Sequence, residues 1–210
     1  SVHSGKWYVE HYIETVTGNY PQTTLVDCGS AAYSTTKGIF WAMRYHPSNG
    51  CEKNTGDNIT GFGTITVVNT SVATFSAGDI IGWHIDIDNK KAWVSKNGTI
   101  PNSGNPATGA YPQFSWTENP INGTTIGSVQ YQTSATILNA GQEGTCAGEI
   151  TAGGNADDSG FGNFKYAPTA GYLAMCSGNL PTVATISPAE TDDNFPKKLF
   201  GVVLYNGNGS

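Results

Sequence analysis

The chain has 210 residues, a formal net charge of −6, 12% charged residues and 27 glycines. This length suits a single well-filled domain, and the acidic balance disfavours a nucleic-acid partner because no basic stripe is available to neutralise phosphates. No run of about 18 apolar residues occurs, so no segment has the character of a membrane-spanning helix.

Alternating apolar and polar residues predict short strands along the chain, separated by turn residues. The predicted strands are residues 6–14, 38–45, 63–68, 79–98 (a hairpin), 111–116, 125–131 and 171–176. No long stretch has apolar residues at helical spacing, so little helix is expected. We therefore predict an all-β fold, an antiparallel two-sheet β-sandwich with apolar inner faces.

The first predicted strand, residues 6–14, presents different side chains on its two faces. Glu10 and Glu14 are expected on the solvated face. His11 interrupts the apolar face, and we interpret it as a packed residue and not as a general base. Four tryptophans lie inside predicted strands and are assigned to the core: Trp7, Trp41, Trp83 and Trp93.

The hairpin at 79–98 is the most distinctive element. One face carries Ile81, Trp83, Ile85 and Ile87, and the other carries Gly82, His84 and Asp86. A polar turn at 88–90 joins the two strands, and Asn97–Gly98 ends the hairpin. Alternation with a period of two predicts a half-buried antiparallel pair, so Trp83 and Ile85 should be buried and His84 should lie on the opposite face.

Three polar segments interrupt the strands: 46–60, 101–109 and 139–160. The last is the longest, and irregular loops of such length are often functional or mobile. The composition changes after Pro181. We therefore assign residues 1–181 to the sandwich domain, and 182–210 to a linker and the first strand of a following module. Because Ser1 lies so close to the first strand, we expect the sequence to belong to a longer chain.

Four cysteines lie at positions 28, 51, 146 and 176, without a CxxC motif or a Cys/His cluster. A zinc site is therefore not expected, and neither is any other metal or cofactor. Two interpretations of the cysteines are open. They are four buried thiols, or they form the disulfides Cys28–Cys51 and Cys146–Cys176 in an oxidising environment.

Three segments resemble a known family: SGKWYVE (4–10), GDIIGWHIDIDNKKAWVSKNG (78–98) and NFKYAPTAGYLAMCSGNLP (163–181). The first two resemble the opening strand and central hairpin of SPRY domains. The third, preceded by Phe161–Gly162, resembles the version found in bacteriophage structural proteins, as does VVLYNGNGS at 202–210. The resemblance implies a concanavalin A-like jelly-roll sandwich that binds through loops at one end and has no catalytic residues. Ala170 in place of a second proline, and the long acidic 139–160 loop, depart from the viral pattern.

Aromatic and polar residues near predicted strand ends and in the longest loop are the candidates for ligand binding, since a ring with a polar edge suits recognition. The predicted ligand-binding residues are Tyr45, His46, Trp116, Glu118, Asn119, Asp157 and Asp158, and Tyr20 and Tyr33 also fall at strand ends. For each ring at a strand end, the alternative interpretation is core or edge packing. Asp157–Asp158 suggests calcium, but two adjacent acids do not define a cage. Asp86 and Asp88 mimic the carboxylate pair of a glycoside hydrolase and are interpreted as turn residues.

These observations predict a non-enzymatic structural or adhesion module of a phage virion, in a tail fibre or a capsid-decoration protein. We expect a homo-oligomer that recognises a host-surface glycan or protein, or a neighbouring virion protein, without binding nucleic acid or inserting into a membrane. Two alternatives remain open: a glycan-cleaving virion sandwich enzyme, and a cellular SPRY adaptor that binds a peptide.

Overall fold

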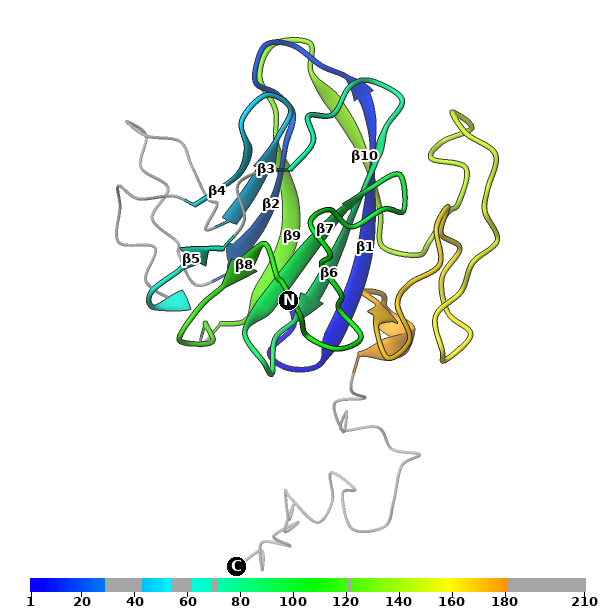
Figure 1. The fold of residues 1–210 in the computed structure, drawn as a ribbon. Helices are drawn as coiled ribbons and strands as arrows, with labels where there is room; N and C mark the ends of the chain where they lie inside the picture. Colours follow the sequence, from blue (N-terminus) through cyan, green and yellow to red (C-terminus); the bar gives the residue numbers. More distant parts are fainter. Residues whose placement is uncertain (29–42, 54–61, 69–71, 121, 181–210) are drawn as a thin grey trace, which may run out of the picture. The chain divides into compact units, whose positions relative to one another are not determined.

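Two β-sheets build the computed structural model, which describes residues 1–28, 43–53, 62–68, 72–120 and 122–180 (Figure 1). The elements are β1 (Lys6–Thr15), β2 (Gln22–Asp27), β3 (Met43–His46), β4 (Gly50–Lys53), β5 (Thr66–Val67), β6 (Ile80–Asp86), β7 (Lys91–Lys96), β8 (Phe114–Ser115), β9 (Thr124–Val129), β10 (Ala135–Asn139), β11 (Leu173–Ala174) and a short 3-10 helix, η2 (Ser177–Asn179). The seven-stranded sheet has the order β10-β1-β6-β7-β8-β5, with β11 parallel to β1. The four-stranded sheet has the order β4-β3-β2-β9 and is antiparallel. The predicted all-β, two-sheet sandwich is confirmed.

The strand predictions differ in how well they locate the strand ends. β1 and the β6–β7 hairpin lie where the alternating pattern places them. Three predicted strands are shorter in the structure, since 63–68, 111–116 and 171–176 correspond to β5, β8 and β11. Tyr33, Trp41 and the 38–42 part of a predicted strand lie outside the described residues. β4 lies inside the segment 46–60 that was predicted to be irregular, because it pairs with β3.

The main hydrophobic core fills the space between the two sheets. The strands of the larger sheet contribute, among others, Trp7, Val9, Ile13, Ile81, Trp83 and Ile85, and those of the smaller sheet contribute Leu25, Met43, Tyr45, Cys51 and Ile126. The Trp83 ring stacks on Phe114 with centroids 5.6 Å apart. Its indole Nε1 also donates to Thr23 Oγ1 of the facing sheet at 2.9 Å. The predicted burial of Trp83 and Ile85 is confirmed.

Residues 140–179, called the covering segment below, pack on the outer face of the larger sheet. They contain β11, which pairs with β1, and they run beside β1 in yellow and orange in Figure 1. Phe164 and Tyr172 of this segment form a second apolar cluster with Tyr8 and Trp93. Trp93 is therefore buried as predicted, but in the outer cluster and not between the sheets.

The covering segment changes the environment of β6. His84 lies on the other face of β6 from Trp83, as the alternation requires. Its ring packs against Tyr8 and Tyr172 at centroid distances of 4.6 and 5.4 Å. Gly82 leaves room for Tyr8, since a Cβ there would lie 2.8 Å from the Tyr8 hydroxyl. All seven residues of β6 are buried. The prediction of a half-buried strand is therefore wrong for β6, because another segment covers the face that was expected to be solvated.

Glu10 holds the covering segment to β1. Its side chain is 1% exposed, so its predicted place on a solvated face is wrong, whereas Glu14 is exposed as expected. Glu10 Oε1 accepts from the Tyr8 hydroxyl at 2.9 Å and from the Tyr166 backbone N–H at 2.8 Å, and Oε2 accepts from the Lys165 N–H at 2.8 Å. Burial raises the pKa of Glu10, and these donors partly oppose that shift.

We expect Glu10→Ala to lower the free energy of unfolding by about 1–3 kcal/mol, because buried donors would lose their acceptor. Glu10→Gln keeps one carbonyl oxygen and should lose less. Urea denaturation measures both effects, and amide hydrogen exchange should become faster at Lys165 and Tyr166 in the alanine variant. Unchanged exchange at these two amides would contradict the role assigned to Glu10.

All four cysteines are free thiols. Cys51 lies in the main core, and Cys146 packs with Tyr12 and Ile80 in a third apolar cluster. Cys28 is exposed and Cys176 is partly buried. Of the two interpretations left open, the structure therefore supports four free thiols and not two disulfides, although only two of the thiols are buried.

The chain divides into two units, Ser1–Asn179 and Leu180–Ser210. Residues 181–210 lie outside the described residues, so the linker and following strand assigned to 182–210 stay a prediction. Within the described ranges, no helix has the length and apolar character needed to cross a membrane.

Candidate functional site

Two of the predicted binding residues, Tyr45 and Trp116, are core residues. Tyr45 is 0% exposed, its hydroxyl donates to the Ala73 carbonyl, and its ring lies edge-on to Phe75. Trp116 is 5% exposed and packs edge-on against Phe62 at a centroid distance of 5.4 Å. Of the two interpretations of these rings, ligand binding and core packing, the structure supports core packing, because both positions face the space between the sheets.

The structure also separates Tyr45 and Trp116. The Trp116 backbone N–H donates to the carbonyl of Lys90, which lies in the turn before β7. Tyr45 binds Ala73, which lines a pocket together with Lys96 at the other end of β7. The predicted residues therefore do not form one site, since they lie at opposite ends of the hairpin.

The remaining predicted residues near these strand ends differ in exposure. His46 is buried, its Nδ1 accepts from the Asn49 N–H at 3.3 Å, and burial lowers the pKa of its imidazole. Glu118 and Asn119 are exposed at the end that contains Trp116. There Asn119 Oδ1 accepts from the Trp116 indole at 3.2 Å, so it supports the core residue next to it.

Asp157 braces the covering segment. Its Oδ1 accepts from the Ser159 and Phe161 N–H groups, both at 2.9 Å, and Oδ2 accepts from the Ala174 N–H at 2.7 Å and from Asn179 Nδ2 at 2.6 Å. Burial opposes ionisation here, but these donors outweigh it and lower the pKa of Asp157. Both oxygens are therefore occupied by the loop itself.

Asp158 has a similar role, since its Oδ2 accepts from the Gly171 N–H at 2.6 Å. Both oxygens of Asp157 and Oδ2 of Asp158 therefore accept from N–H groups of the covering segment. No group of three or more histidine, cysteine or acidic side chains that suits a metal ion occurs in the part of the chain that the structure describes.

Asp86 and Asp88 stabilise the hairpin turn and the start of β1. Asp86 is buried, and both of its oxygens accept from Asn89: Oδ1 from the backbone N–H at 2.9 Å and Oδ2 from Nδ2 at 2.8 Å. Lys6 Nζ also lies 3.5 Å from Asp86 Oδ2. Asp88 Oδ1 accepts from the Gly5 N–H at 3.0 Å. This geometry fits the turn interpretation of both residues.

Five loops gather at one end of the sandwich, here called the loop end: residues 16–21, 47–49, 72–79, 97–101 and 130–134. Strand register places them together. β1 pairs with β6 and β10 so that Tyr12 lies opposite Ile80 and Thr15 lies opposite Ala135. In the smaller sheet Gln22 lies opposite Val129. The loops that leave these strands therefore emerge at the same end.

Side-chain contacts tie the loops to one another. Thr17 and Thr133 share a hydroxyl–hydroxyl bond of 2.9 Å, and the Ser48 hydroxyl donates to Asn19 Oδ1. The rings of Tyr20 and Tyr131 lie 5.4 Å apart at their centroids. Three of the five loops, 16–21, 47–49 and 130–134, are therefore joined to one another, and Asn97 Nδ2 joins the other two by donating to Asp79 Oδ1 at 2.7 Å.

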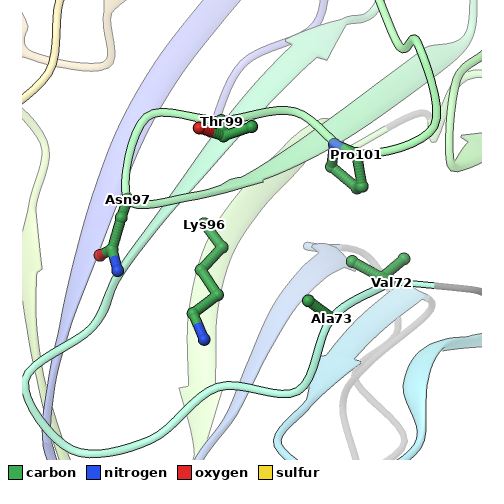
Figure 2. A pocket seen from close by; sticks show the side chains of 6 residues that line it. All are labelled: Val72, Ala73, Lys96, Asn97, Thr99 and Pro101. Carbon is green, nitrogen blue, oxygen red and sulfur yellow. The ribbon is translucent and has the colours of Figure 1, made fainter.

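A pocket of about 220 Å³ opens at the loop end. Figure 2 shows Val72 and Ala73 on one side and Lys96, Asn97, Thr99 and Pro101 on the other. Its walls are mostly apolar, and the Lys96 ammonium is paired with Asp79 Oδ2 at 3.0 Å and donates to the Thr74 carbonyl at 2.8 Å. The pocket therefore offers apolar contact, with its one lysine already neutralised.

Tyr131 is 58% exposed and was not among the predicted binding residues. The alternating pattern predicts a strand at 125–131 that includes Tyr131, whereas β9 ends at Val129. The run Gln-Tyr-Gln-Thr-Ser at 130–134 is the signal that indicates a polar turn.

No protein-family model and no curated protein matches the sequence. The function is therefore argued from the geometry of the loop end.

Proposed function

We propose that this chain is a SPRY-type recognition module of a bacteriophage virion, in a tail fibre or a capsid-decoration protein. It binds a host-surface molecule or a neighbouring virion protein through the loop end, without turning it over. The observation that carries this proposal is the set of five loops at one end of a filled sandwich, three of which are joined by side-chain contacts. Recognition sites are commonly loops held by a rigid scaffold.

The chemistry of the loop end supports binding. Tyr131 offers an exposed ring with a polar hydroxyl, and such rings contribute much contact area at low entropic cost. The pocket beside Lys96 adds an apolar recess. The carboxylates that an enzyme would use are engaged elsewhere, since Asp86 holds a turn and Asp157 holds the covering segment.

Multiple copies would strengthen such a site. A surface of a few loops gives modest affinity, and joining several copies in a homo-oligomer raises the effective concentration for each further contact. A tail fibre or decoration protein meets its target in this multivalent form. The proposal therefore includes homo-oligomeric display on the particle.

The test uses the purified, fluorescently labelled chain with host cells and, separately, with the proteins of dissociated virions. We expect retention on at least one of them and no release of reducing sugar from extracted surface polysaccharide. A double variant of the loop end, Tyr20→Ala with Tyr131→Ala, should lose retention, whereas Tyr111→Ala, at an exposed tyrosine on the loop before β8, should keep it. Retention on neither material would contradict the proposal. Release of sugar that Asp86→Asn abolishes would favour the glycan-cleaving alternative.

A further inference from the structure

The part of the loop end around Tyr131 carries no charged side chain. Three loops compose it: VTGNYP at 16–21, PSN at 47–49 and QYQTS at 130–134. Their exposed side chains are amides, hydroxyls and a tyrosine ring, including those of Asn19, Ser48, Asn49, Tyr131, Gln132 and Thr133. A nearby charge on the smaller sheet, Arg44, is paired with Glu52. The three loops are therefore polar and neutral within a chain whose net charge is −6, and the exposed Glu14 before the first loop is an acidic neighbour.

Tyr131 is held in a defined position on this surface. Its N–H donates to Ser134 Oγ at 2.9 Å, and the Ser134 hydroxyl donates back to the Tyr131 carbonyl at 2.8 Å. Tyr20 supports the ring from the neighbouring loop, with an angle of 43° between the two planes. A ring positioned before the ligand arrives saves the entropy of ordering it on binding.

This combination selects a class of ligand. An aromatic face packs against the C–H groups of a sugar ring, and amide and hydroxyl side chains both donate to and accept from sugar hydroxyls. An anionic polymer or a charged peptide would find no opposite charge on the three loops. The free-energy cost of removing water from its charged groups would therefore not be compensated. The chemistry therefore matches a neutral, hydroxyl-rich ligand.

We infer that the loop end binds a neutral carbohydrate, with Tyr131 packed against a sugar ring and the amides of Asn19, Asn49 and Gln132 bonded to its hydroxyls. This inference rests on the proposed function and specifies its ligand. A host-surface polysaccharide and a glycan attached to a protein share this chemistry.

The test is affinity electrophoresis of the full chain in native gels that contain dextran, mannan or galactan, with heparin as the anionic probe. We expect at least one neutral polysaccharide to retard the chain and heparin to leave its mobility unchanged. Tyr131→Ala should weaken the retardation about tenfold or more, as truncation of a central aromatic contact does, and Tyr111→Ala should not. Circular dichroism checks that both variants remain folded, as expected for exposed residues.

Salt provides a second readout. Binding measured by calorimetry at about 50 mM and about 500 mM NaCl should differ less than about twofold, because screening acts only on charged contacts. Retardation by heparin alone, no retardation by any neutral polysaccharide, or full binding by Tyr131→Ala would overturn the inference. If the chain is still retained by host cells or virion proteins in that case, the proposed function stands with another ligand. If it is retained by neither, the proposed function fails too.

Discussion

Trp83→Ala should lower the free energy of unfolding by about 3–5 kcal/mol, the range for truncating a large buried ring. Trp83 is fully buried between the sheets and stacks on Phe114 at an interplanar angle of 10°. Its indole N–H is also a polar contact between the two sheets, through Thr23. The substitution therefore removes core volume, a ring contact and an inter-sheet hydrogen bond together.

Urea denaturation followed by far-UV circular dichroism measures this loss. Trp83→Phe keeps a ring in the same place and should cost less than the alanine variant. Tyr111→Ala removes an exposed ring and should change the stability by less than about 0.5 kcal/mol. A Trp83→Ala midpoint equal to that of the parent chain would contradict the register of β6 in the core.

Acidification should destabilise the fold through His11 and His84. Burial lowers the pKa of both imidazoles from 6.5 to about 3. Both nitrogens of His11 and Nδ1 of His84 have no hydrogen-bond partner among the described residues, so nothing compensates a charge there. The unfolded chain binds these protons first as the pH falls below 6.5. The stability that the neutral imidazoles provide is therefore complete above that pH and decreases toward pH 3.

The expected slope is about 1.4 kcal/mol per pH unit for each histidine between about pH 6 and about pH 4. Urea denaturation at several pH values measures it, and His11→Leu should reduce it by the contribution of one proton. NMR titration of the imidazole resonances in the parent chain gives the two pKa values directly. A midpoint near 6.5 for His11 would show that its ring is hydrated and would contradict the prediction.

Local alternation was sufficient to predict the strands that carry the core. In β1 and in the β6–β7 hairpin, successive side chains point to opposite sides, so Trp83 and His84 had to lie on different faces. The polar turn at 88–90 and the Asn97–Gly98 turn set the ends of the hairpin. These features depend on neighbours in sequence, which is why the sequence by itself determined the all-β fold and the placement of Trp83 and Ile85.

Only the tertiary structure decided what covers each face and which loops meet. Alternation cannot show that residues 140–179 fold back over β1 and β6, and so it left Glu10 on a solvated face where the structure buries it. It also could not tell that Tyr45 and Trp116 lie at opposite ends, or that Tyr20 and Tyr131 meet at one end. Such contacts follow from the pairing of distant strands, and the residues involved carry no local signal of their partners.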